Sequence, residues 1–370
     1  MKGRVDVQIK TNRLLGLDVL RFIAITLVIF HHLLLNNQDT FSYSFLNTAL
    51  RGGWTGVDLF FVLSGFLVSG LLFTEFKAQG KVRLGRFLLR RAWRIYPPFW
   101  VMIFFSVLLY DFHFWDRFYL HGFLGEMTFL QNYIGGLWGP TWSLAVEEHF
   151  YLLLTLIFFL LLNLNKNSQT LFRTTPWIFL CVAVICLAAR YVYANKHGIS
   201  GAIDLIHKSH FRVDSLMFGV LLSYWWHMKA TERHKQWLTR NGGKMVVGGA
   251  MCFLPAFVWN APSILFIPVF GVILFYIGGG AMVLGAISRS TFTGRFWTLL
   301  ANLGRHSYSV YLWNGIVYEV FVTAIRTQAG VRWSNYLEFI TVFTLSWLVG
   351  ILAAKTFETP FLKLRERYVP

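Results

Sequence analysis

The chain has 370 residues, of which 56% are hydrophobic and 14% charged, and its formal net charge is +17. Soluble domains carry about 25% charged residues, so this composition excludes a water-soluble globular protein. Basic cytoplasmic loops of a membrane protein account for the excess of Lys and Arg, and no nucleic-acid partner is expected. The 3 cysteines lie in apolar stretches without metal-ligand spacing, so neither they nor other residues predict a metal site.

Apolar stretches long enough to cross a roughly 30 Å hydrocarbon core recur along the chain. They predict an all-α fold, a polytopic transmembrane bundle of about ten helices that forms a single domain over residues 1–370. We expect tails at residues 1–13 and 361–370 and no fused soluble domain. The predicted spans cover residues 14–35, 56–76, 97–112, 141–162, 176–194, 213–227, 245–259, 264–287, 303–325 and 336–357.

The distribution of basic residues between the loops predicts the orientation. With the N-terminus inside, 25 of the 34 Lys and Arg residues fall in cytoplasmic segments and 7 in outer loops. Cytoplasmic loops accumulate Lys and Arg, so both termini are expected to be cytoplasmic. The first span is too long and too charged for a cleavable signal peptide.

Ionisable residues inside the first span form the first candidate site. A charge at mid-membrane costs about 2.5–3.5 kcal/mol on insertion scales, so Arg21 and His32 call for a role. Their spacing is close to three helical turns, which puts both on nearly the same face, and Asp18 lies within ion-pair reach of Arg21. The imidazole can act as a base for a hydroxyl group. A structural histidine beside a snorkelling arginine is the alternative.

A basic stripe precedes the third span. Arg86, Arg90 and Arg94 recur every four residues, with Arg91 beside them. Arginine binds phosphate oxygens bidentately, so the nucleotide of coenzyme A would suit this stripe. Positive-inside bias and anionic lipid predict a similar pattern, and this alternative stays open.

Two adjacent carboxylates enter the membrane at the start of the fourth span. Pro140 and Thr141 predict a helix start at the outer face, and Glu147 and Glu148 follow within two turns. The two side chains point about 100° apart on a helix, so we expect different partners. One would orient the histidine or bind a substrate hydroxyl, and the other would pair with an arginine. An internal ion pair is the alternative.

Seven stretches, in order and spacing, resemble acyltransferase family 3, the bacterial integral membrane acyltransferases. The resemblance runs from residue 14 to residue 361. The matching stretches are Leu17–Arg21 with His32, Gly56–Leu67, Arg90–Pro97, Trp142–Tyr151, Arg212–Gly219, Ser307–Trp313 and Glu358–Phe361.

The resemblance implies an integral protein of a bacterial inner membrane that takes acyl-CoA from the cytoplasm and acylates a sugar hydroxyl at the outer face. Acyl-CoA, expected to be acetyl-CoA, is a co-substrate, and no tightly bound cofactor is expected. Carried over, Arg21 and His32 become catalytic residues. The donor-binding residues become Arg90, Arg91 and Arg94, with Tyr96 of the same stretch. Residues expected to bind substrate or support the site are Asp18, Asp58, Ser64, Trp142, Arg212 and Asp214.

Two features depart from the family pattern. Asn314 stands where many relatives have histidine, which puts any role of that histidine in doubt here. No SGNH-type hydrolase domain follows residue 361, so the chain would transfer the acyl group itself or hand it to a separate periplasmic partner.

The residues together favour O-acylation, above all O-acetylation, of a carbohydrate. His32 would deprotonate the acceptor or carry the acyl group, and Glu147 or Glu148 would orient the imidazole or the acceptor. A transporter or flippase for a glycolipid or anion is the alternative from another class, although the paired repeats typical of transporters are not detected. A structural or assembly factor would tolerate substitutions at Arg21 and His32.

Overall fold

The computed structural model describes residues 15–35, 51–111, 120–164, 171–259, 265–288, 291–321 and 335–369. These residues form helices and turns, without a strand among them, which confirms the all-α prediction. The predicted tail at residues 1–13 lies outside the described residues.

The α-helices follow one another along the chain. They are α1 (Leu15–Leu35), α3 (Gly56–Gln79), α4 (Leu84–Asp111), α5 (Leu120–Thr128), α6 (Gln131–Ile134), α7 (Trp142–Leu164), α8 (Thr175–His197), α9 (Ala202–His207), α10 (Val213–Tyr224), α11 (Glu232–Met251), α12 (Leu254–Val258), α13 (Val272–Ile287), α14 (Arg295–Gly304), α15 (Ser307–Phe321), α16 (Asn335–Ala353) and α17 (Thr359–Tyr368). The π-helical segments are η5 (Trp225–Lys229), η7 (Ile267–Gly271) and η9 (Ala354–Glu358).

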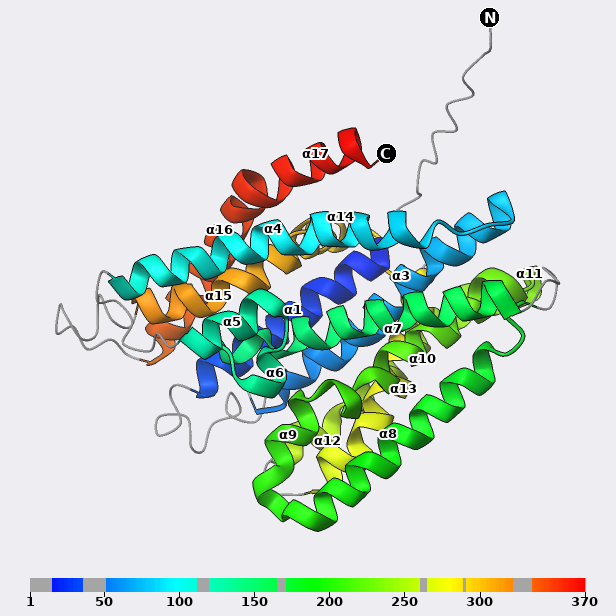
Figure 1. Ribbon diagram of the computed structural model, residues 1–370, viewed down its shortest axis with the longest axis horizontal. Helices are drawn as coiled ribbons and strands as arrows, with labels where there is room; N and C mark the ends of the chain where they lie inside the picture. Colours follow the sequence, from blue (N-terminus) through cyan, green and yellow to red (C-terminus); the bar gives the residue numbers. More distant parts are fainter. Residues whose placement is uncertain are drawn as a thin grey trace, which may run out of the picture.

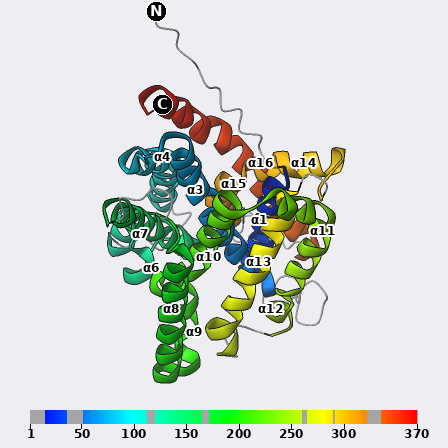
Figure 2. The ribbon, with the colours of Figure 1, turned by 90° about the vertical axis from the view of Figure 1, so that its right-hand side faces the viewer.

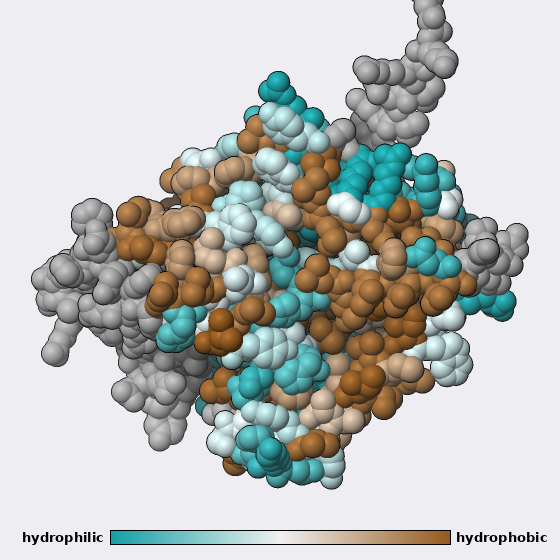
Figure 3. All heavy atoms as spheres, viewed as in Figure 1, coloured by the Kyte–Doolittle hydropathy of each residue, from teal (hydrophilic) through white to brown (hydrophobic). Residues whose placement is uncertain are grey.

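Several of these helices are built to cross a membrane. Seven stretches of the described chain are long and apolar enough to do so. Their outward faces carry large apolar side chains such as Leu156, Ile185 and Leu348, which are 52%, 65% and 59% exposed. Figure 3 shows such residues over broad areas of the visible surface. Apolar patches of this extent belong against lipid, and the chain is an integral membrane protein. The count of ten spans and the orientation stay predictions.

Helix α1 lies in the middle of the bundle, where it packs against α3, α13, α14 and α15 (Figures 1 and 2). Close packing depends on small residues. A Cβ on Gly65 of α3 would lie 1.9 Å from the carbonyl oxygen of Leu216 in α10, and one on Gly304 of α14 would lie 1.9 Å from a carbonyl oxygen of α1. A Cβ on Gly278 of α13 would lie 2.6 Å from the Gly249 oxygen of α11, so this glycine lets α13 and α11 approach closely.

The third predicted span is part of a longer helix. Helix α4 runs unbroken from Leu84 to Asp111 with Pro97 and Pro98 inside it. Pro97 and Pro98 lack the N–H groups that would donate to the Trp93 and Arg94 carbonyls, four residues earlier. In the same turn the Tyr308 hydroxyl of α15 donates to the Ile95 carbonyl, 2.8 Å away, and attaches α15 to α4. The helix continues through both prolines, so the basic stripe and the second half of α4 form one continuous helix.

Two other boundaries differ from the predictions. The predicted span 245–259 is divided between α11 and α12, and α11 already begins at Glu232. A capping box at Thr231 and His234 starts the helix there, before the apolar stretch. The segment predicted as a C-terminal tail forms α17, with Pro360 in its first turn, where proline is well tolerated.

Candidate active site

His32 and Asn314 face each other between α1 and α15. The Nδ1 atom of His32 lies 2.8 Å from Oδ1 of Asn314, which is buried. The amide nitrogen of Asn314 donates to the Tyr311 carbonyl, so its oxygen is the atom that faces the ring. An oxygen acceptor there requires a proton on Nδ1, and the lone pair then resides on Nε2, the nitrogen suited to act as base or nucleophile. The asparagine that departs from the family pattern is thus a direct partner of the predicted catalytic histidine.

The inner part of α1 carries the second predicted catalytic residue, Arg21. Its Nη1 atom lies 3.3 Å from Oδ1 of Asp18, which confirms the predicted ion pair. Arg305, at the end of α14, reaches the other carboxylate oxygen of Asp18 at 3.6 Å. Arg21 is half-buried and stands roughly 16 Å from His32 along the helix axis.

Glu147 of α7 lies within a network that joins three helices to α1. The Tyr151 hydroxyl donates to Oε2 of Glu147 at 2.8 Å, and the Ser64 hydroxyl of α3 lies 2.8 Å from the Tyr151 oxygen. Since the single tyrosine proton goes to the carboxylate, Ser64 donates to Tyr151. Arg91 of α4 lies 5.8 Å from the centre of the Tyr151 ring, and both Arg91 and Arg21 lie within electrostatic range of Glu147.

Glu148 has a different partner, as its direction on the helix predicts. The Tyr96 hydroxyl of α4 donates to Oε2 of Glu148 at 2.9 Å. Within the described chain neither Glu147 nor Glu148 hydrogen-bonds His32, so Asn314 occupies the orienting position that the sequence analysis offered to a carboxylate. Orientation of the acceptor by one of them stays a prediction.

The predicted donor-binding arginines face two directions. Arg91 points into the bundle toward Tyr151, whereas Arg90 lies on the side of α4 near Arg365 of α17. Arg94 lies within electrostatic range of both Arg365 and Glu147. In the part of the chain that the structure describes, neither Arg90 nor Arg94 has a carboxylate within ion-pair distance. Uncompensated guanidinium groups of this kind suit an anionic ligand.

Four of the remaining predicted residues belong to a buried cluster on α3, α7 and α10. Arg212 donates to Asp58 at 2.5 Å, and Arg190 of α8 donates to Asp214 at 2.8 Å. The side chains of these two ion pairs are all 0% exposed. The Arg212 guanidinium also lies over the Trp142 ring, 5.6 Å from its centre. Each charge has an opposite charge beside it, so this cluster holds helices together.

Sequence reasoning missed a buried carboxylate on the predicted outer side, Glu126 of α5. Its Oε1 accepts hydrogen bonds from the Trp138 backbone at 3.0 Å and the Thr141 hydroxyl at 2.8 Å. No cation lies within ion-pair distance of it among the described residues. Burial raises the pKa of Glu126 to about 7. The adjacent Gly136 leaves room for it, since a Cβ there would lie 2.6 Å from the carboxylate.

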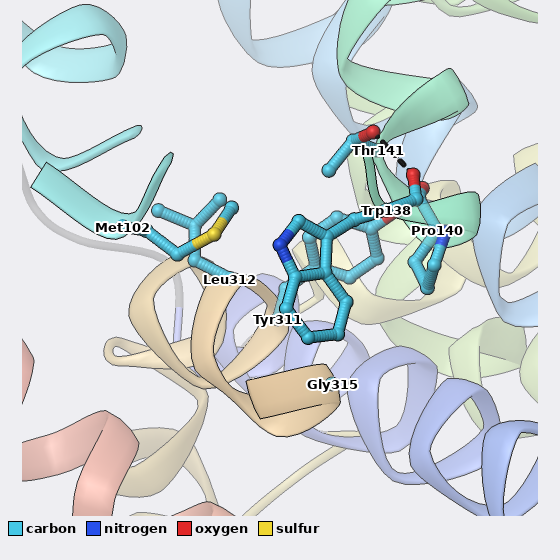
Figure 4. A pocket seen from close by; sticks show the side chains of 7 residues that line it. All are labelled: Met102, Trp138, Pro140, Thr141, Tyr311, Leu312 and Gly315. Carbon is cyan, nitrogen blue, oxygen red and sulfur yellow. Dashed lines mark hydrogen bonds between the residues drawn. The ribbon is translucent and has the colours of Figure 1, made fainter. Parts of the chain in front are cut away.

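A small cavity of ≈ 10 Å³ lies next to this segment, between Met102 of α4, Trp138 and Tyr311 of α15 (Figure 4). Its volume is about that of one water-sized group. Its described lining does not include His32 or Arg21.

Comparison with known proteins decides the family. A sequence model described as an acyltransferase domain, acyltransferase family 3, matches residues 14–355. The chain belongs to this acyltransferase family. The match covers every segment of the polar network described above, from α1 to the start of η9.

Three bacterial relatives of this chain are informative. The peptidoglycan O-acetyltransferase OatA of Listeria monocytogenes is 25% identical over 94% of this chain and 56% of its own length. A Staphylococcus aureus protein, SAR0937, whose name proposes O-acetyltransferase activity, is 25% identical over 96% of this chain and 59% of its own. YrhL of Bacillus subtilis, whose name proposes peptidoglycan O-acetyltransferase activity, is 26% identical over 90% of this chain and 53% of its own length.

The chain therefore spans slightly more than half the length of these relatives. No solved structure matches it significantly.

The sequence contains a local signal for one further residue of the network, Tyr151, but none for the contact made by Tyr308. Tyr151 follows Glu147 by four residues, the spacing at which helix side chains meet. Tyr308 lies in a matched stretch, but its bond to the α4 backbone depends on how α15 and α4 pack. No sequence signal reveals such a contact between distant segments.

Proposed function

We propose that this chain is a membrane O-acyltransferase that moves an acyl group, most simply acetyl, from cytoplasmic acyl-CoA to a sugar hydroxyl at the outer face. The observation that carries the proposal is the His32–Asn314 pair, an imidazole of the central helix held with its proton on Nδ1. Family membership and the names of the relatives support the same reaction class.

The proposed reaction starts from the His32 tautomer that carries its proton on Nδ1 and its lone pair on Nε2. With Nε2 of His32 as base, the acceptor hydroxyl loses its proton to the imidazole as its oxygen attacks the thioester carbonyl. The carbon–sulfur bond breaks, and the departing thiolate takes the proton from the imidazolium, which restores the histidine. Alternatively, Nε2 attacks the thioester carbonyl first, and the carbon–sulfur bond breaks as the thiolate leaves. The acceptor oxygen then attacks the acyl group, the carbon–nitrogen bond breaks, and the proton of the hydroxyl passes through the imidazole to the thiolate.

The donor would enter from the basic end of α4. Arg90 and Arg94 supply positive charge without carboxylate partners in the described chain, which suits the phosphates of coenzyme A. Arg91, Arg21 and Glu147 continue the polar path toward the level of His32. Burial of the thioester between these helices would keep water from hydrolysing it.

The names of the Listeria and Bacillus relatives suggest peptidoglycan as the acceptor. Its exposed sugar hydroxyls lie outside the membrane, where the proposed orientation would deliver the acyl group. Transfer of the acyl group to a separate partner is also part of the proposal.

The test is acyl transfer by purified protein in liposomes, with acetyl-labelled acetyl-CoA and an N-acetylglucosamine oligosaccharide as acceptor. We expect His32→Ala to lower transfer about 10²–10⁴-fold, the range that general bases contribute. The neighbouring His31→Ala, which points away from Asn314, is the matched control and should transfer normally. Full activity of His32→Ala would contradict the proposal, and oligosaccharide flux without thioester consumption would favour a transporter.

A second measurement separates the two roles of the histidine. Wild-type protein is mixed with labelled acetyl-CoA in the absence of acceptor and quenched. Label retained on a peptide that contains His32 would show an acyl carrier, and absence of label with normal turnover would show a general base.

A further inference from the structure

The C-terminal helix α17 lies along the basic half of α4. The two helices are in contact, and α17 lies beside α4 in both views (Figures 1 and 2). The rings of Trp93 and Tyr368 stack with centroids 6.4 Å apart and an interplanar angle of 17°. This aromatic contact fixes one face of α17 against the arginine-bearing face of α4.

Arg365 belongs to that same face of α17, since it precedes Tyr368 by three residues. Its side chain is only 17% exposed, and its Nε is buried without a hydrogen-bond partner in the described chain. The nearest carboxylate is that of its neighbour Glu366, 3.6 Å away and itself 70% exposed. A contact of this length with an exposed carboxylate compensates little of the buried charge.

Arg90 and Arg94 of α4 lie close enough to Arg365 for the three positive charges to repel one another. Repulsion of this kind costs stability unless an anion neutralises it. The contrast with Arg190 and Arg212 is direct, because each of those has an aspartate within 2.8 Å. The cluster on α4 and α17 therefore has the composition of a site for an external anion.

We propose that Arg365 joins Arg90 and Arg94 in a phosphate-binding site between α4 and α17. Three guanidinium groups from two helices can bind a phosphate from two sides, which one helix face alone cannot do. The shared ligand chemistry is a phosphate ester, either of a nucleotide or of a lipid headgroup. The choice of the acyl-CoA nucleotide rests on the proposed function, whereas the phosphate site itself does not.

The test uses the full chain in nanodiscs of phosphatidylcholine, titrated with adenosine 3′,5′-bisphosphate in a calorimeter. We expect Arg365→Ala to raise the Kd at least about 10-fold, which corresponds to the loss of about 1.4 kcal/mol. Lys363→Ala removes the same charge from the exposed face of α17 and should change the Kd less than about 2-fold. Arg365→Lys should bind between the two, because it keeps the charge but not the fork of donors.

A second arm distinguishes the sources of the phosphate. Nanodiscs that contain phosphatidylglycerol are analysed by native mass spectrometry for lipid retained on each variant. Loss of lipid retention in Arg365→Ala, with unchanged nucleotide binding, would assign the site to a lipid headgroup. Weaker nucleotide binding with unchanged lipid retention would assign it to a nucleotide. Equal behaviour of Arg365→Ala and Lys363→Ala in both arms would overturn the proposal.

These measurements do not depend on catalysis. Nucleotide binding that requires Arg365, in a protein that transfers no acyl group, would remove the proposed function and leave the phosphate site in place. Acyl transfer with an unchanged KM for acetyl-CoA in Arg365→Ala, together with unchanged lipid retention, would remove the phosphate site and leave the proposed function in place.

Discussion

Two regions of this protein gather charged side chains between helices, and they do so in opposite ways. On α3, α8 and α10, Arg212 and Arg190 each face an aspartate, and all four side chains are fully buried. On α4 and α17, Arg90, Arg94 and Arg365 gather without comparable partners in the described residues. Intramembrane charge alone therefore does not mark a site. A charge that already has its counterion serves the fold, and one that lacks it suits a ligand.

The network around Glu147 stands between these extremes. Its carboxylate accepts a hydrogen bond from Tyr151 and lies near several arginines without a close ion pair in the described chain. Such an arrangement keeps polar groups ready for a substrate while the helices remain packed. Substitutions at particular residues test this difference between paired and unpaired charges.

The largest expected effect is a loss of stability when the buried Arg212–Asp58 ion pair is broken. Arg212→Ala leaves Asp58 buried without a counterion, which should destabilise the protein by about 3–5 kcal/mol. Thermal unfolding in detergent measures this. Arg90→Ala is the matched control from the unpaired cluster and should leave the melting temperature unchanged or raise it. Equal losses for the two variants would erase the distinction between the regions.

Glu126 offers a buried carboxylate that has no cation beside it in the described chain. Because its pKa rises from 4.5 to about 7, the folded state keeps a proton that the unfolded state releases. Stability should therefore fall as pH rises through that window, by up to about 3 kcal/mol.

Glu126→Gln stays neutral and keeps the acceptor oxygen for Trp138 and Thr141. We expect it to match wild type near pH 4 and to exceed it in thermal stability at pH 8. A wild-type stability that rises between those pH values, and a glutamine variant that is no more stable, would show that the carboxylate is ionised in the fold.

For the catalytic network, Glu147→Gln should lower acyl transfer about 100-fold with the melting temperature unchanged. The reason is that Glu147 is the carboxylate within range of Arg21 and Arg91 together with the Tyr151 hydroxyl. Glu148→Gln, which loses charge beside Tyr96 and Arg91 but not beside Arg21, should cost less. The transfer assay with acetyl-CoA measures both, and a larger effect at Glu148 would reverse the assignment.

The smallest effect is expected at Asn314. Asn314→Ala removes the acceptor for the Nδ1 proton of His32 and should lower kcat about 10-fold with little change in KM. Asn314→Asp keeps an oxygen there and should recover part of the rate. If Asn314→Ala changed KM alone, the residue would act on substrate binding and not on the imidazole.

Much of the site was predictable because the relevant signals are local. The pairing of Asp18 with Arg21 follows from a three-residue spacing, and the different partners of Glu147 and Glu148 follow from adjacent helix positions. The start of α7 after Pro140 and Thr141 was likewise evident. The unbroken course of α4 through Pro97 and Pro98 was not, since prolines favour a helix boundary and the contact of Tyr308 with this turn joins segments far apart in the chain.

The sequence by itself determined that this is an all-helical membrane protein of the acyltransferase family, because hydrophobic length, loop charge and motif order are properties of the chain alone. Only the tertiary structure decided which charges are neutralised. Asp58 and Arg212 are 154 positions apart, and His32 and Asn314 are 282 apart. Contacts over such separations arise from helix packing, and packing therefore separates the charges that hold the bundle from those left for a substrate.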